Sequence, residues 1–164
     1  MQRLKKWLRY IGAAMLLAGA IVGVEILLEQ PMGIFSGSRP SDLGFNAGKF
    51  KPCSWKPNCV SSTAPKDDAR HFIEPLMLRG APEAGWNKLK DLLASNPRVK
   101  IITDQPGYIH AEFKSAAMGF VDDAEFALDA GARVIHVRSG SRLGRRDFDV
   151  NRKRVESIRA QLAK

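Results

Sequence analysis

The sequence has few of the side chains from which common catalytic and metal sites are built. It contains two cysteines and three histidines in 164 residues, and the histidines, His71, His110 and His136, stand apart from one another. It has no G-x-S-x-G elbow, Walker loop, G-x-G-x-x-G run or H-E-x-x-H motif. These absences argue against the familiar hydrolase, nucleotide-binding and zinc-protease classes, and we expect no metal and no cofactor.

The two cysteines, Cys53 and Cys59, lie in the run PCSWKPNCVSS. A single C-x5-C run lacks the second pair of ligands that a zinc site needs. The two prolines and the asparagine between the cysteines suit a tight turn that brings the thiols together. We therefore expect a disulfide, which is the natural state of two such cysteines in an exported domain, rather than a metal site.

Acidic residues are scarce in the last part of the chain. Residues 31–132 contain 12 Lys/Arg and 12 Asp/Glu, whereas residues 133–164 contain 10 Lys/Arg and only 3 Asp/Glu. The formal net charge of +9 is therefore largely local, and the excess is concentrated in residues 138–154, RSGSRLGRRDFDVNRKR. This basic block marks one surface as suited to an anion.

The first 28 residues contain one long apolar run. Residues 10–24 carry no charge and no proline, and four Lys/Arg precede them. Residues 7–28 would form about 33 Å of helix, enough to cross a hydrocarbon core of about 30 Å. We expect residues 1–28 to anchor the chain in a bacterial inner membrane with the N-terminus cytoplasmic and the soluble domain periplasmic. A cleaved signal peptide is the alternative, because residues 18–20 give an A-x-A pattern.

The remainder divides into a linker and one domain. Residues 29–51 are rich in Gly, Pro and Ser and show neither a helical nor a strand period, which predicts a flexible linker. Residues 52–164 are enough for one domain with one core and too few for two.

Periodicity in the domain predicts a helix, four strands and a second helix. Apolar residues at helical spacing, Trp86, Leu89, Leu92 and Leu93, indicate a helix over residues 82–96. The strand-like runs cover residues 99–103, 108–115, 120–128 and 132–139. Turn residues between them favour antiparallel pairing, and Val155, Ile158 and Leu162 mark the buried face of a closing helix. The fold class is therefore α+β, a two-layer domain with an about four-stranded antiparallel sheet and both helices on one face.

The basic block contains the candidate anion-binding residues. Its guanidinium groups suit bidentate binding of an oxyanion, and backbone N–H groups near its glycines and the helix N-terminus would assist. The candidates are Arg138, Ser139, Ser141, Arg142, Arg145 and Arg146.

An internal network is the competing interpretation of the same block. Strand alternation places Asp122 on the core face, where a buried carboxylate must be paired. Arg142, Asn151 and Arg154 are the expected partners, and Asn151 lies four residues before Val155 on the buried face of the last helix. The other arginines of the block would then face outward: Arg138, Arg145, Arg146 and Arg152.

Catalytic candidates are few. Asp122, Ser139 and Ser141 could act together in a hydrolase or transferase, with the arginines stabilising an oxyanion. Nothing in their spacing requires such a grouping, and His110 and His136 are expected to be surface or packing residues.

Three separated segments resemble one known family. PNCVSS, GYIHAEFKSAAMGFVDDAEFAL and the basic block are similar in order and spacing to Domain of Unknown Function 1499, a bacterial and plastid family, over residues 52–162. Its last block usually reads close to RSxSRxGxxDxGxNRxR, and Asp149 stands here where a glycine is usual. The matching residues are Ser139, Ser141, Arg142, Gly144, Asp147, Asn151, Arg152 and Arg154. The resemblance implies a compact domain often joined to a membrane segment or export signal, and it implies no activity.

These observations favour a membrane-anchored envelope protein whose domain binds or scaffolds rather than catalyses. The expected partners are the membrane itself, anionic lipid or an acidic envelope polymer, and export excludes nucleic acid. Two alternatives remain: a hydrolase or transferase acting on a phosphate- or acyl-bearing substrate, and an accessory subunit of a membrane complex.

Overall fold

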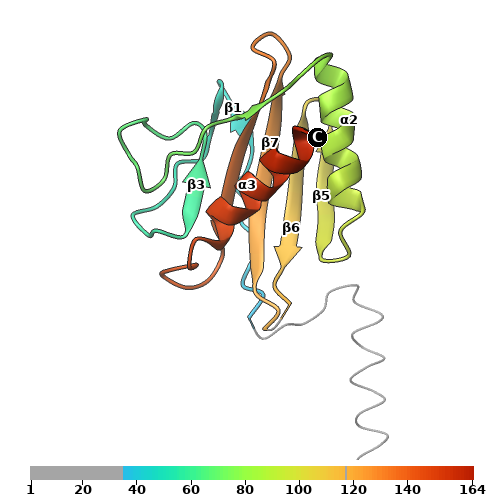
Figure 1. The fold of residues 1–164 in the computed structure, drawn as a ribbon. Helices are drawn as coiled ribbons and strands as arrows, with labels where there is room; N and C mark the ends of the chain where they lie inside the picture. Colours follow the sequence, from blue (N-terminus) through green and yellow to red (C-terminus); the bar gives the residue numbers. More distant parts are fainter. Residues whose placement is uncertain (1–34, 117) are drawn as a thin grey trace, which may run out of the picture. The chain divides into compact units, whose positions relative to one another are not determined.

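The computed structural model describes residues 35–116 and 118–164 (Figure 1). The predicted anchor, residues 1–28, lies outside the described residues. Within the described part of the chain, no helix is long and apolar enough to cross a membrane. The described residues form one compact unit.

The centre of this unit is a six-stranded sheet in which all paired strands are antiparallel. Its strands are β3 (Cys59–Ser61), β4 (Leu76–Met77), β5 (Val99–Gln105), β6 (Tyr108–Lys114), β7 (Val121–Asp129) and β8 (Val134–Ser141). The order is β3-β8-β7-β6-β5, and β4 also pairs with β8. The four longest strands are those that periodicity predicts.

The α+β class is confirmed, but the expectation of about four strands is wrong. The strands not predicted, β3 and β4, span three and two residues. Both pair with β8, β3 near its end and β4 near its start. A segment this short does not repeat the alternation of side chains often enough to be recognised in a sequence.

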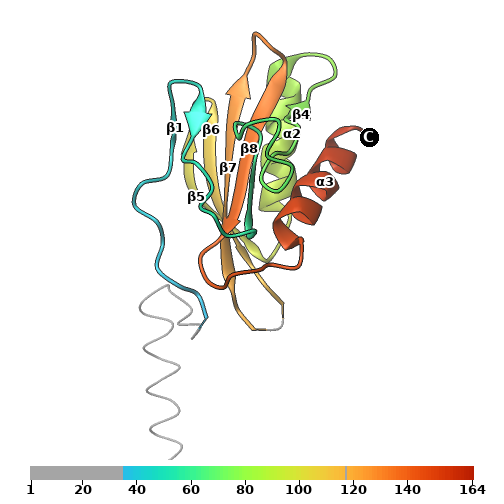
Figure 2. The same ribbon diagram turned by 90° about the vertical axis from the view of Figure 1, so that its left-hand side faces the viewer.

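Both helices pack on one face of the sheet. They are α2 (Pro82–Ala94) and α3 (Val150–Leu162), and Figure 2 shows them on one side of the sheet with β1 on the other. The helix α2 buries Trp86, Leu89 and Leu93. It ends two residues before the predicted Asn96, because Pro97 disfavours a helical conformation in the residue that precedes it. The helix α3 buries Asn151, Val155 and Ile158.

The opposite face of the sheet is covered by the segment Phe35–Lys51, which we call the N-terminal strap. It contains the two-stranded hairpin of β1 (Phe45–Asn46) and β2 (Lys49–Phe50). Phe50 is buried, and the backbone N–H of Gly44 donates a 2.7 Å hydrogen bond to Glu125 on β7. Residues 35–51 of the predicted linker thus contain this hairpin and contact the sheet, although they have no periodic apolar face of their own.

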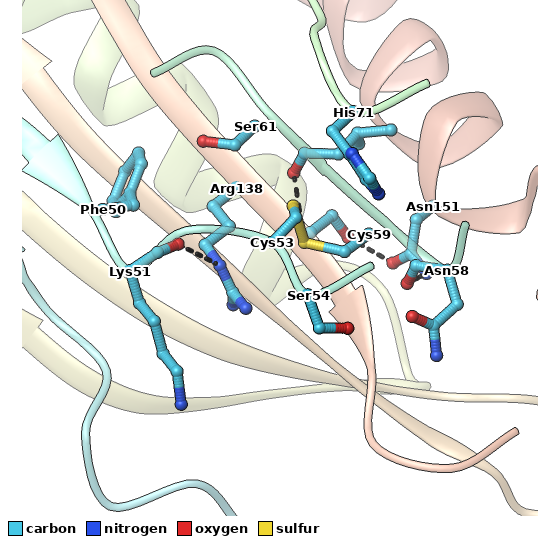
Figure 3. Close-up of a disulfide and its surroundings, with 12 residues drawn as sticks. Phe50, Lys51, Cys53, Ser54, Asn58, Cys59, Ser61, His71, Arg138 and Asn151 are labelled. Carbon is cyan, nitrogen blue, oxygen red and sulfur yellow. Dashed lines mark hydrogen bonds between the residues drawn. A yellow bond between two sulfur atoms is a disulfide. The ribbon is translucent and has the colours of Figure 1, made fainter. Parts of the chain in front are cut away.

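The cysteines form the expected disulfide, which is confirmed. Cys53 and Cys59 are bonded with their Cα atoms 5.7 Å apart (Figure 3). In the register of β3 with β8, Cys59 lies opposite Gly140. A Cβ atom at Gly140 would lie 3.3 Å from both Cβ and Sγ of Cys59, so the absence of a side chain there lets the disulfide pack directly on β8.

Candidate functional site

Two polar networks lie on opposite faces of β7. Asp122 and Asp123 are neighbours in the chain, so their side chains point to opposite faces of the sheet. Asp122 faces the helices and Asp123 faces the N-terminal strap, and both are buried. Each carboxylate pairs with an arginine of the basic block.

The helix-side network is centred on Arg154. Its Nη2 donates a 2.5 Å hydrogen bond to Oδ2 of Asp122, and its Nη1 donates to Ser139 Oγ at 2.9 Å and to Asn151 Oδ1. Ser139 Oγ also donates to Asn151 Oδ1 at 2.6 Å. The guanidinium carbon lies 4.6 Å from the ring centroid of Phe113. Arg154 therefore links α3 to both β7 and β8.

Asn151 joins this network to the loop before α3. Its amide Nδ2 donates to Asn58 O at 3.1 Å, Ser141 Oγ at 2.9 Å and Asp147 Oδ2 at 2.8 Å. Asp147 also accepts the backbone N–H of Asn151 at 3.0 Å, which satisfies one of the free donors in the first turn of α3. Figure 3 shows Asn151 beside Asn58 and the disulfide. A fully buried asparagine thus connects α3 to β8 and to the residue that precedes β3.

The strap-side network is centred on Arg142. Its Nε and Nη2 each donate a 2.8 Å hydrogen bond to Asp123, and Nη2 also donates to Glu112. Nε2 of His110 lies 2.8 Å from Asp123, and Arg39 of the strap donates to Glu112 at 2.6 Å. A bidentate arginine–carboxylate pair of this kind has a fixed geometry as well as a strong charge-assisted bond.

A second buried acid, Glu125, completes the strap side. Arg138 Nη1 lies 3.2 Å from Glu125 Oε2, and the Tyr108 hydroxyl donates to Oε1 at 2.9 Å. Burial raises the pKa of the Tyr108 phenol, and the neighbouring Glu125 carboxylate raises it further. Arg138 also donates to the Lys51 carbonyl of the strap, a bond drawn in Figure 3.

The pKa values of the strap-side acids are set by opposing effects. Burial raises the pKa of Asp123, but the hydrogen bonds from Arg142 and His110 outweigh it, so the net shift is below the usual 3.8. In the same way, the bonds from Arg39 and Arg142 outweigh burial and lower the pKa of Glu112 below its usual 4.5. Both carboxylates are therefore ionised at neutral pH.

The structure brings together three members of the proposed internal network and separates the fourth. Asp122, Asn151 and Arg154 are in contact, whereas Arg142 lies on the other face with Asp123. The reason is the length of β8, which extends to Ser141, two residues beyond its predicted end. Continued alternation places Arg142 on the same face as Arg138.

The six candidate anion-binding residues divide into two groups. Ser139 is fully buried, and Arg138, Ser141 and Arg142 all take part in internal hydrogen bonds. Arg138 therefore differs from the outward position expected for it, as does Arg152, which donates to backbone carbonyls of residues 69, 70 and 72. Arg145 and Arg146 are exposed, as expected.

Arg145 and Arg146 line a cleft of about 470 Å³, which we call the arginine cleft. The guanidinium carbon of Arg145 lies 5.2 Å from the ring centroid of Trp55. The remaining lining residues are Pro57, Arg70, Asp147, Phe148 and Asp149. Sequence reasoning missed Trp55 and Arg70, because they belong to other loops, and only the disulfide turn and the end of β3 place those loops beside the basic block.

A second cavity, of about 270 Å³, adjoins the arginine cleft and shares Arg146, Asp147 and Phe148 with it. Its apolar lining comes from Phe120, Val121, Leu143, Phe148 and Val150. Asp122 and Ser141, which are direct partners in the register of β7 with β8, also line it. None of the three histidines of the chain lines this cavity. Of the catalytic candidates, Ser139 has no exposed surface and its hydroxyl already donates to Asn151.

Comparison with known proteins identifies the family. The model of the family described as "Protein of unknown function (DUF1499)" matches residues 49–162. The chain belongs to the DUF1499 family. No curated protein and no solved structure matches the chain. The matched range contains the whole helix-side network of this DUF1499 domain. It contains the strap-side network without Arg39 and Gly44, which precede residue 49.

The conformation of Asp149 accounts for the glycine that the resemblance to the family leads us to expect there. Asp149 has φ of 63°, and the preceding Phe148 has φ of 55°. This left-handed conformation suits glycine and costs other residues free energy. The Asp149 side chain makes no capping hydrogen bond to α3 that would offset this cost.

We expect Asp149→Gly to raise the free energy of unfolding by about 0.5–1 kcal/mol, because glycine adopts a positive φ without a Cβ clash and no side-chain bond is lost. Denaturant titration of both proteins measures the difference. Gly80→Ala makes the reverse change at a position with φ of 81° and open space around it, and should lower the free energy of unfolding. A less stable Asp149→Gly protein would contradict this account of the turn.

We expect Asp122→Ala to lower the free energy of unfolding by about 3 kcal/mol or more, because it leaves the guanidinium of Arg154 enclosed without its carboxylate. Asp91→Ala on the exposed side of α2 is the control and should change stability little. Melting behaviour equal to that of the unsubstituted protein would show that the Asp122–Arg154 pair does not hold the domain together.

We expect the destabilisation caused by Asp123→Asn to depend on pH. The folded pKa of Asp123 lies below the unfolded value, so its stabilisation is complete above about pH 4 and is lost as the pH falls through the folded pKa. The variant should be less stable by about 2 kcal/mol at about pH 6, and the difference should shrink towards about pH 2. Melting temperatures across this range test it, and a constant difference would argue against an ionised Asp123.

Proposed function

We propose that this DUF1499 domain is a non-enzymatic binding domain that holds an anionic group, of the phosphate or carboxylate type, in the arginine cleft. The proposal includes the expected N-terminal anchor, which would keep the domain at a membrane of the cell envelope. The observation that carries it is the contrast between the arginines that are used internally and those that line the cleft.

Three guanidinium groups line the arginine cleft: those of Arg70, Arg145 and Arg146. Among the residues that the structure describes, none of the three takes part in an ion pair. Arg138, Arg142 and Arg154, by contrast, are each paired with a buried acid. The buried acids of the domain are therefore paired with other arginines, and the three arginines of the cleft are available to bind an external anion.

Two acids, Asp147 and Asp149, also line the cleft, so its three arginines leave a formal excess of one positive charge. The carboxylate of Asp147 accepts hydrogen bonds from the backbone N–H of Asp149 and from Asn151, and so holds the turn before α3. Trp55 contributes an aromatic face, which can pack against an arginine or against the apolar part of a ligand. A shaped cleft with an aromatic wall and three forked donors favours a specific oxyanion site over general surface charge.

The internal networks support binding rather than catalysis. Among the described residues, no buried side-chain nitrogen or oxygen lacks a hydrogen-bond partner. Asp122 and Ser139 are thus satisfied within the protein. Asp122 and Ser141 both line the second cavity, but Asp122 is paired with Arg154 and Ser141 Oγ accepts a hydrogen bond from Asn151, and no histidine lines this cavity to accept a proton from the serine.

The proposal is tested by titrating the full-length chain, in a neutral detergent, with inorganic phosphate and pyrophosphate in a calorimeter. We expect saturable binding that Arg145→Ala with Arg146→Ala weakens at least about tenfold, because each guanidinium supplies charge-assisted hydrogen bonds of about 1.5–3 kcal/mol. Unfolding temperatures should not change, since neither side chain holds the fold. Arg79→Ala, an exposed arginine outside the cleft, is the control. Equal binding by the double variant, or no binding by the unsubstituted chain, would refute the proposal.

A further inference from the structure

Exposed apolar side chains gather at one end of the domain. Six of the seven large apolar residues that are exposed in the described part of the chain surround the loop between β8 and α3, and we call them the apolar rim. They are Phe35, Trp55, Met118, Leu143, Phe148 and Val150. The seventh, Met77, pairs with Val134 at the opposite end of β8. Figure 1 shows the β6–β7 turn and the β8–α3 loop at the same end of the sheet.

Contacts and shared cavities join the members of the rim other than Met118 into one surface. The rings of Phe35 and Phe120 are 5.1 Å apart, and Phe120, Leu143, Phe148 and Val150 line the same cavity. Phe148 and Trp55 both line the arginine cleft. The rim and the cleft are therefore parts of one continuous face.

Phe148 is the most exposed member, with 84 % of its surface open to solvent. Its backbone is in the left-handed region, which is rare for a large residue and costs free energy. This backbone conformation costs free energy, and within the domain it does not bury the aromatic side chain. Burial of the side chain against a partner would offset this cost.

The composition of this face fits the boundary of a lipid bilayer. Aromatic and aliphatic side chains enter the region between headgroups and acyl chains, and arginines beside them contact lipid phosphates. Arg145 and Arg146 lie in the chain between Leu143 and Phe148, so an anion held by these arginines is adjacent to the rim. A cluster that combines these two chemistries fits a membrane surface better than a free inorganic anion.

If the expected anchor crosses a bilayer, the short stretch of chain that follows it would keep the same end of the domain near the membrane. Phe35 is both the first described residue and a member of the rim. The expected anchor ends at residue 28, and the six residues between them span at most about 25 Å when fully extended. If residues 7–28 cross a bilayer, this end of the domain stays within that distance of its surface.

We propose that the apolar rim docks on the surface of an anionic lipid bilayer, with the side chains of Leu143, Phe148 and Val150 entering the acyl boundary and Arg145 and Arg146 on lipid phosphates. This inference rests on the proposed function, because the arginine cleft supplies the phosphate contacts. It adds the source of the phosphate, a lipid headgroup, and the orientation of the domain.

The test is amide hydrogen exchange on the full-length chain in nanodiscs, with one chain per disc, made either of phosphatidylcholine alone or with added phosphatidylglycerol. We expect amides of residues 142–149 to exchange about tenfold more slowly in the anionic discs than in the neutral ones, because lipid covers them and two arginines contribute attraction. Leu143→Ser with Phe148→Ser should remove this protection, and Met77→Ser should retain it. Unchanged exchange in β7 would show that each variant is folded.

Equal exchange rates in the two kinds of disc, or protection that survives in the double serine variant, would overturn bilayer docking. Protection that appears only when several chains share a disc would instead identify a second copy of the chain as the partner, which also overturns it. The calorimetric titration with pyrophosphate separates the two proposals. Binding of pyrophosphate without lipid protection would refute docking alone, whereas loss of pyrophosphate binding would refute the anion site.

Discussion

The structure depends on a sheet strand, β7, that is buried on both faces and carries an acid on each. Asp122 faces the helices and Asp123 faces the N-terminal strap, and neither carboxylate could stay ionised there without a guanidinium partner. Both partners come from the segment that follows β8, Arg142 immediately after the strand and Arg154 within α3. The connection between β8 and α3 is thereby fixed at both ends, on opposite faces of the sheet, by the same pair of neighbouring aspartates.

This arrangement separates a scaffold from a surface within one basic block. Arg138 and Arg142 on the strap side and Arg154 on the helix side hold the fold, and Asn151 connects the start of α3 to Asn58, next to Cys59 of the disulfide. Between the two fixed points the chain is free to present Arg145 and Arg146 outward. The internal pairs therefore determine the position of the loop that lines the cleft. A substitution of Asp122, which does not itself line the cleft, would be expected to change the shape of the cleft through this loop.

Periodicity predicts the four long strands and the two helices that carry the core, and strand alternation places Asp122 on the core face. Alternation does not select the partner of Asp122 among Arg142, Asn151 and Arg154, and it is Arg154 that binds this carboxylate. The same alternation places Asp123 and Glu125 on the other face of the sheet. The predicted two-layer fold has no element to cover that face. They are buried because Phe35–Lys51 crosses that face, and the contact of Gly44 with Glu125 joins residues 81 positions apart. That segment has no apolar period and is held by polar bonds together with single aromatic contacts such as buried Phe50, so no local pattern predicts where it lies. Trp55 and Arg70 were missed for the same reason, since only tertiary contacts place them at the cleft.

The loop between β8 and α3 is longer than joining the two elements requires. β8 ends at Ser141 and α3 begins at Val150, which leaves eight residues where two to six are usual for a strand-to-helix connection. Two of the eight, Arg142 and Asp147, serve the internal networks, and Gly144 has a positive φ that turns the chain. The others include two unpaired arginines and an aromatic residue held outward by an unfavourable backbone. A loop whose only role was to close the fold would lose these features without loss of stability, so their presence points to a contact outside the domain.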